Sequence, residues 1–139
     1  MNLEFVEHLP SSGKKASGVV FLLHGYGSNC SDLISLVPEL GESFSDIHFI
    51  SPNAPFIHDS GFPGMYQWYS LTRMNDSFLY EGAKTAEPIL IKFFESQLNR
   101  LDIPASRAVV CGFSQGGMMT LHTFLRYRKK LAGIISLSG

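Results

Sequence analysis

Several hallmarks of specialised protein classes are scarce or absent in this sequence. No run approaches the ~20 apolar residues that a membrane-spanning helix needs. The only cysteines are Cys30 and Cys111, too few for a disulfide framework. The formal net charge of −1 provides no long-range attraction to nucleic acid or to an anionic membrane. These absences argue against a transmembrane protein, a disulfide-stapled scaffold and a nucleic-acid-binding protein.

The first residues also lack the pattern of a secretory signal. Glu4 and Glu7 stand where a signal peptide would carry basic residues followed by an apolar stretch. We therefore expect a cytoplasmic protein whose two thiols are reduced and buried. No pair among the five histidines, with or without the cysteines, has metal-ligand spacing, so we expect no metal site.

The pattern of apolar segments predicts an α/β fold. With 139 residues, 45% of them hydrophobic and 17% charged, the chain fits one globular domain. Short apolar runs at 19–23, 48–50, 108–111 and 133–137 predict buried strands, and an alternating segment at 4–7 predicts an exposed one. Helical spacing marks 81–101, 116–127 and a short helix capped by Ser31; Pro88 predicts a kink or a restart. We expect a mostly parallel sheet with helices on both faces.

The segment 52–71 has a different composition. Proline, glycine and aromatic residues are crowded there, and no period is visible. Loops of this length inside compact domains often carry function. An aromatic-packed surface loop is an equally good interpretation of the composition alone.

One motif predicts covalent chemistry. A glycine-rich turn directly follows the apolar run 108–111 and directly precedes a helix, in the order Gly112-Phe113-Ser114-Gln115-Gly116-Gly117. In a strand-turn-helix this tight, the serine is strained and its hydroxyl points out of the sheet, while larger side chains at Gly112 and Gly116 would clash. We predict Ser114 as a nucleophile and the backbone N–H of Gln115 as an oxyanion donor.

A second glycine-rich turn follows the first buried run, at His24-Gly25-Tyr26-Gly27-Ser28. This is where strand-turn-helix hydrolases offer their other oxyanion donor, and the backbone N–H of Tyr26 is the candidate. Taken alone, Gly25 and Gly27 would indicate only a tight turn. His24 is expected to be a structural hydrogen-bonding residue rather than a base.

Together these segments resemble the phospholipase/carboxylesterase family, which includes the acyl-protein thioesterases. The matching segments are 22–28, 52–55, 67–69, 112–117 and 131–139. The resemblance implies an α/β-hydrolase fold and hydrolysis of carboxylic esters or thioesters, on small-molecule or acylated substrates, without a cofactor. It places Gly25, Gly27 and the 52–71 loop beside the substrate, with Trp68 as a wall of an acyl pocket.

The residues after Ser114 do not complete a catalytic triad. The 25 residues that follow it contain no Asp and no Glu, and His122 is their only histidine. His122 lies eight residues along the same helix, roughly 12 Å away along its axis, whereas a base must come within about 3 Å. Upstream, His58 with Asp59 beside it is the least improbable substitute.

The chain therefore resembles the N-terminal portion of a longer enzyme. We expect residues 1–139 to form one truncated α/β-hydrolase domain without its C-terminal strands. Three hypotheses remain: a truncated or split serine hydrolase, a non-catalytic remnant, or a half complemented by a fragment that supplies Asp and His. The last strand, 133–137, should present an unpaired apolar edge that favours self-association. Loss of triad residues costs on the order of 10⁶ in kcat, so the isolated chain should be weakly active.

Overall fold

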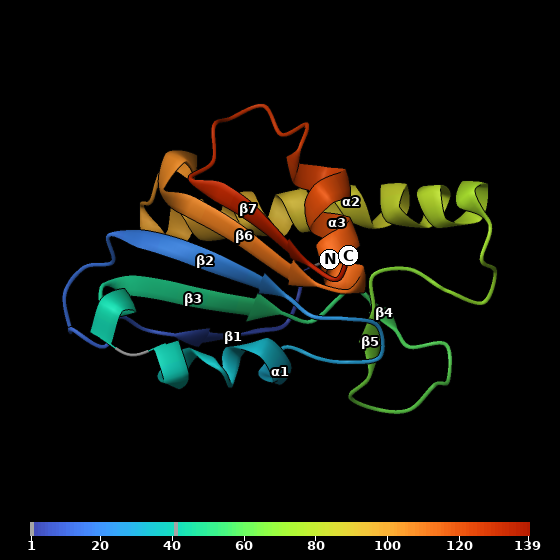
Figure 1. Ribbon diagram of the computed structural model, residues 1–139, viewed down its shortest axis with the longest axis horizontal. Coiled ribbons are helices and arrows are strands. Elements are labelled where there is room, and N and C mark those ends of the chain that lie inside the picture. The colour runs from blue at the N-terminus through green and yellow to red at the C-terminus, as the bar shows by residue number, and fades with distance from the viewer. Residues whose placement is uncertain (1, 41) are drawn as a thin grey trace.

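A five-stranded sheet organises the molecule (Figure 1). The structure is a computed structural model that describes residues 2–40 and 42–139. The strand order is β1-β3-β2-β6-β7, in which β1 pairs with β3 in antiparallel fashion and all other pairs are parallel. The strands are β1 (Phe5–His8), β2 (Gly18–Leu23), β3 (Ile47–Pro52), β6 (Ala108–Phe113) and β7 (Gly133–Leu137). The predicted mostly parallel sheet is confirmed.

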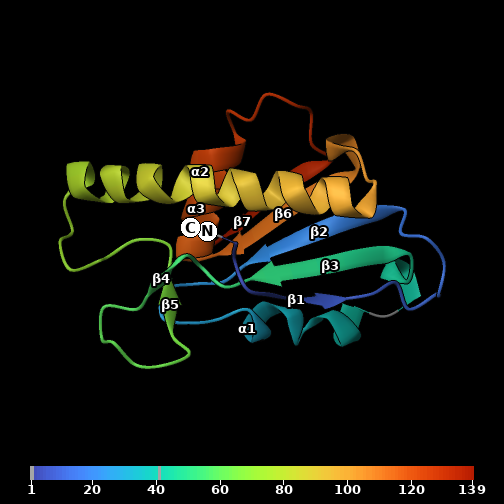
Figure 2. The same ribbon diagram turned by 180° about the vertical axis from the view of Figure 1, so that it is seen from behind.

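Helices cover both faces of this sheet, as predicted. Two long helices, α2 (Asp76–Leu101) and α3 (Gln115–Phe124), lie on one side (Figure 2). The opposite side carries α1 (Ser31–Ile34) and two 3₁₀ turns, η1 (Val37–Leu40) and η2 (Glu42–Phe44). A third 3₁₀ turn, η3 (Ala105–Arg107), leads into β6. No helix in the described part of the chain is both long enough and apolar enough to cross a membrane.

The central strand β2 is apolar on both faces because each face packs against a helical layer. Phe21 faces α2, where its ring lies 4.7 Å from that of Phe94 between centroids. Leu22 faces the other way and packs with Val37 and Phe49 beneath the short helices. The larger of the two cores lies under α2 and α3.

The short helix α1 differs from its prediction. Its N-cap residue is Cys30, whose side chain makes no capping bond, so the expected cap at Ser31 is wrong. Cys30 and Cys111 are free and only half-buried, which corrects the expectation that both thiols are buried.

The long helix α2 begins five residues before its predicted start. Asn75 caps it by accepting a hydrogen bond of 2.9 Å from the N–H of Phe78. Pro88 lies in the middle of one continuous helix, so the predicted alternative of a restart is wrong. Pro88 is exposed, and the lost backbone hydrogen bond therefore leaves its acceptor near water.

The 52–71 loop contains a small hairpin of β4 (Phe56–Ile57) and β5 (Tyr66–Gln67). Figure 1 shows this hairpin beyond the carboxyl ends of β2 and β3. Among the described residues, β1 and β7 are the two edge strands, and Ile135 and Leu137 of β7 are 46% and 48% exposed. The predicted apolar edge is confirmed.

Candidate active site

Ser114 lies in a tight turn between β6 and α3. Its backbone has φ 51° and ψ −119°, a conformation that side-chain-bearing residues rarely adopt and that costs of order 1–3 kcal/mol. A Cβ at Gly112 would overlap the carbonyl of Gly116, and a Cβ at Gly116 would overlap the carbonyl of Leu23. The two glycines therefore allow β2, β6 and α3 to approach closely enough to form the predicted strand-turn-helix.

Hydrogen bonds on both sides hold the Ser114 backbone. Its N–H donates to the carbonyl of Leu137 at 2.8 Å, which ties the turn to the end of β7. Its own carbonyl accepts from the N–H of Met118 at 3.0 Å and so opens helix α3. The side chain of Ser114 stays half-exposed.

The turn after β2 lies directly against this serine. A Cβ built on Gly25 would be 3.4 Å from the Cβ of Ser114. Gly27, at φ +78°, lies further out and donates its N–H to the carbonyl of Tyr66 at 2.8 Å. Within residues 2–40 and 42–139, no hydrogen bond uses the backbone N–H of Tyr26 or of Gln115. Gln115 directly follows Ser114 in the sequence. Tyr26 directly follows Gly25, which lies against Ser114 in space.

His24 is buried beneath the same turn and has both ring nitrogens satisfied. Nδ1 donates to the carbonyl of Gly25 at 2.8 Å, and Nε2 accepts from the N–H of Ala54 at 2.9 Å. Burial lowers the pKa of His24, against the opposing effect of the bond to Gly25, so the ring is neutral. The predicted structural role of His24 is confirmed.

Trp68 is fully buried in the structure, and its role as an acyl-pocket wall stays a prediction. Its side chain has no exposed surface, and its indole N–H donates to the carbonyl of His24 at 2.9 Å. A buried indole requires such an acceptor, and the turn after β2 supplies it. Its neighbours Gln67 and Tyr69, by contrast, line a hollow of about 420 Å³ between the hairpin and the start of α2.

The side chain of Gln115 joins the elbow to the 52–71 loop, a role that the motif did not reveal. Its Oε1 accepts from the N–H of Trp68 at 3.0 Å, and its Nε2 donates to the carbonyl of Tyr69 at 2.7 Å. All three residues are buried. The residue predicted to supply an oxyanion donor is therefore itself held by the loop.

No histidine in the described residues makes a hydrogen bond to Ser114. His122 faces α2, with Nε2 3.4 Å from a carboxylate oxygen of Glu87, in agreement with its predicted exclusion as a base. The Nδ1 of His58 pairs with the hydroxyl of Ser60 at 2.8 Å. Nor does any cluster of three or more His, Cys, Asp or Glu in the described ranges have the arrangement of a metal site.

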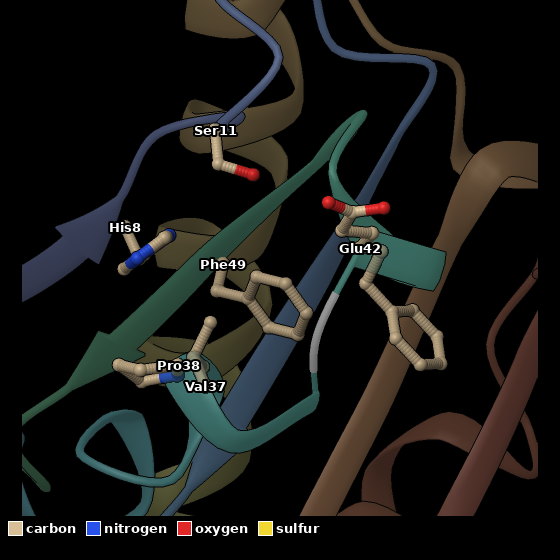
Figure 3. Close-up of a pocket in the computed structure, with 7 residues that line it drawn as sticks. His8, Ser11, Val37, Pro38, Glu42 and Phe49 are labelled. Carbon is tan, nitrogen blue, oxygen red and sulfur yellow. The ribbon is translucent and has the colours of Figure 1, made fainter.

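A separate cavity of about 320 Å³ lies on the α1 side of the sheet (Figure 3). Its lining comes from the end of β1, the 3₁₀ turns and β3, with His8 and Glu42 on opposite sides of Phe49. It contains none of the residues around Ser114 and is not part of the same site.

Comparisons with known proteins agree with this geometry. The model of the phospholipase/carboxylesterase family matches residues 5–139. Acyl-protein thioesterase 1 of Candida albicans is 30% identical over 142 residues, covering 94% of this chain and 60% of the relative. Its counterpart in Schizosaccharomyces pombe is 33% identical over 127 residues, covering 88% and 56%. The crystal structure of esterase PE8 superposes with a TM-score of 0.90 at 37% identity, covering 98% of this chain and 63% of that one. The chain thus spans about three fifths of the length of these relatives.

Proposed function

Because the chain belongs to the phospholipase/carboxylesterase family and has the α/β-hydrolase fold, we propose that it supplies the nucleophile, Ser114, for hydrolysis of carboxylic esters or thioesters. The observation that carries the proposal is the strained turn at φ 51°, which the sequence maintains by the two glycines that leave no room for a Cβ. The relatives' name, acyl-protein thioesterase, supports acylated substrates as the class to test first.

The chemistry follows from the groups around the serine. The Ser114 oxygen forms a bond to the acyl carbon, and the carbonyl oxygen takes up negative charge. In this proposal the N–H groups of Tyr26 and Gln115, which make no hydrogen bond within the described residues, donate to that oxygen. The carbon–oxygen or carbon–sulfur bond then breaks, and the serine proton passes through a base to the leaving group. Water hydrolyses the acyl-serine in a second, equivalent step.

We assign the base and its orienting acid to residues beyond these 139. This assignment rests on the surroundings of three histidines: both ring nitrogens of His24 are bonded, Nδ1 of His58 pairs with Ser60, and Nε2 of His122 lies 3.4 Å from Glu87. The missing groups would come from further chain or from a separate complementing fragment that packs on the exposed edge strand β7. The two free cysteines suit a reducing compartment such as the cytoplasm.

The test compares the complete gene product with its Ser114→Ala variant in hydrolysis of p-nitrophenyl acetate and of a palmitoyl thioester. We expect a loss of at least about 10³-fold, since removal of the nucleophile leaves only residual catalysis. Ser96→Ala serves as the control, because Ser96 lies on α2 and its hydroxyl bonds only the carbonyl of Phe93. Equal rates for wild type and Ser114→Ala would refute the proposal.

A second measurement separates a complemented enzyme from a non-catalytic remnant. The 139-residue chain is treated with a fluorophosphonate probe, alone and after co-expression with a fragment carrying the family's remaining length. Labelling of Ser114 only in the co-expressed sample supports complementation, whereas no labelling in either sample supports the remnant. Ile135→Lys should lower self-association of the isolated chain in sedimentation velocity, because a charge on an edge strand opposes edge-to-edge pairing.

A further inference from the structure

Asp59 is the most heavily bonded side chain of the 52–71 loop. One carboxylate oxygen accepts from the hydroxyl of Tyr26 at 2.6 Å, the hydroxyl of Ser70 at 2.9 Å and the N–H of Leu71 at 3.3 Å. The other accepts from the amide of Gln67 at 2.9 Å, and the Asp59 N–H donates back to that amide at 2.8 Å. A single surface carboxylate thus joins three segments of the loop to the turn after β2.

The electrostatics agree with an ionised carboxylate in this position. Partial burial would raise the pKa of Asp59, but the hydrogen bonds from Tyr26, Gln67 and Ser70 outweigh it and bring the pKa below its ordinary value. Burial, together with the hydrogen bond and negative charge of Asp59, raises the pKa of Tyr26 to about 12. The phenol therefore remains a donor and the carboxylate an acceptor throughout the neutral range.

The turn that Asp59 holds is the one that carries a proposed oxyanion donor. On one side the turn packs on Ser114 through Gly25. On the other it pairs with the hairpin, since Gly27 donates to Tyr66 and Tyr66 donates back to Ser28, at 2.8 and 2.9 Å. Between these two anchors the Tyr26 side chain extends to Asp59, and its ring also packs against His58.

A triad role for Asp59 does not fit these contacts. A triad acid must bond the nitrogen of a catalytic histidine. The neighbouring His58 uses Nδ1 for Ser60, and both Asp59 oxygens are taken by Tyr26, Gln67, Ser70 and Leu71. The carboxylate instead contacts the side chain of Tyr26, the proposed oxyanion donor.

The same loop holds the second donor in a parallel way. Gln115 is fixed through its side-chain amide by the backbone of Trp68 and Tyr69. In the proposed mechanism the N–H groups of Tyr26 and Gln115 face the reacting oxygen. The side chains of both residues are anchored to one segment, 59–71. Fixed donors stabilise a developing oxyanion without reorganising during the reaction, which is where most of their effect arises.

We propose that Asp59 is a positioning residue for the oxyanion hole, acting through the hydroxyl of Tyr26, and that the 59–71 loop braces both donors. The inference rests on the proposed function of Ser114. It gives the loop a positioning role in transition-state stabilisation.

The test measures kcat and KM of the complete gene product on p-nitrophenyl acetate for Tyr26→Phe, Asp59→Ala and the double variant. Loosened donors act on the transition state, so kcat should fall about tenfold or more while KM stays within about twofold. The double variant should be within about twofold of Asp59→Ala, because the one bond that Tyr26→Phe removes is already lost in that variant. Tyr80→Phe is the control, since Tyr80 is an exposed tyrosine on α2 whose ring packs against His122.

Amide hydrogen exchange on the 139-residue chain gives a second readout that needs no turnover. The N–H groups of Gly27 and Tyr66 bridge the turn and the hairpin, and their exchange should quicken at least about fivefold in Tyr26→Phe and Asp59→Ala but not in Tyr80→Phe. Wild-type exchange, or faster exchange with kcat unchanged, would overturn the positioning role. If Ser114→Ala retained the wild-type rate, the proposed function itself would fail, which is a separate outcome.

Discussion

Replacement of Gln115 by methionine tests how the elbow and the loop are joined. Methionine preserves the length and volume of the side chain but removes both polar atoms. The N–H of Trp68 and the carbonyl of Tyr69 would then lose their partners, and both belong to buried residues. A buried backbone group left unpaired costs about 1–3 kcal/mol, so the two together predict a loss of roughly 2–6 kcal/mol in the free energy of unfolding.

Urea denaturation followed by circular dichroism measures this loss. With a slope of about 2 kcal/mol per molar, the midpoint should fall by roughly 1–3 M without a change of slope. The matched control is Gln97→Met. Gln97 is also buried, but its amide oxygen bonds only the exposed side chain of Arg100 at 2.6 Å, so no backbone group is orphaned. We expect that variant to lose no more than about 1 kcal/mol. Equal losses at the two positions would refute the reasoning that orphaned backbone groups dominate.

Two further predictions concern the elbow glycine and the partly exposed ion pair between Glu7 and Arg100. Gly116→Ala places a Cβ onto the carbonyl of Leu23 and should abolish soluble expression or cost at least about 3 kcal/mol in urea melts, whereas Gly133→Ala, with nothing nearer than 4.0 Å, should cost less than about 1 kcal/mol. Burial would raise the pKa of Glu7, but hydrogen bonds from Arg100 and a buried histidine lower it below 4.5. The stabilising contribution of Glu7 should therefore be complete above about pH 4.5 and be lost as the pH falls through its folded-state pKa. The melting temperatures of wild type and Glu7→Gln should differ at about pH 6 and converge at about pH 3. A difference independent of pH would contradict this assignment.

The elbow was predictable because its constraints are local. A glycine two residues before and two residues after a serine, between an apolar run and a helical pattern, has few other structural solutions. The strands were predictable for the same reason, since continuous apolar runs need two covered faces. The start of α2 was missed because Asp76 and Ser77 are exposed and the two apolar residues that follow, Phe78 and Leu79, are adjacent and do not by themselves show a helical period.

The connections between the elbow and the loop were not predictable from local pattern. Trp68 meets its acceptor on His24 across 44 positions of sequence, and Gln115 meets Trp68 across 47. An aromatic loop without a period gives no indication of which ring is buried and which is exposed. The importance of Asp59 lies in four partners brought together by folding, and only its place beside His58 was visible in the sequence.

The positive φ of Ser114 also bears on how this chain changes over generations. Glycine tolerates that backbone angle at no steric cost, so Ser114→Gly should relieve part of the roughly 1–3 kcal/mol of strain at this residue. In a lineage without use for a nucleophile, mutation pressure and selection for stability would favour that substitution. The serine at position 114 is therefore kept at a cost in folding stability. Sequencing of close variants for glycine at position 114 would show whether selection still retains the serine.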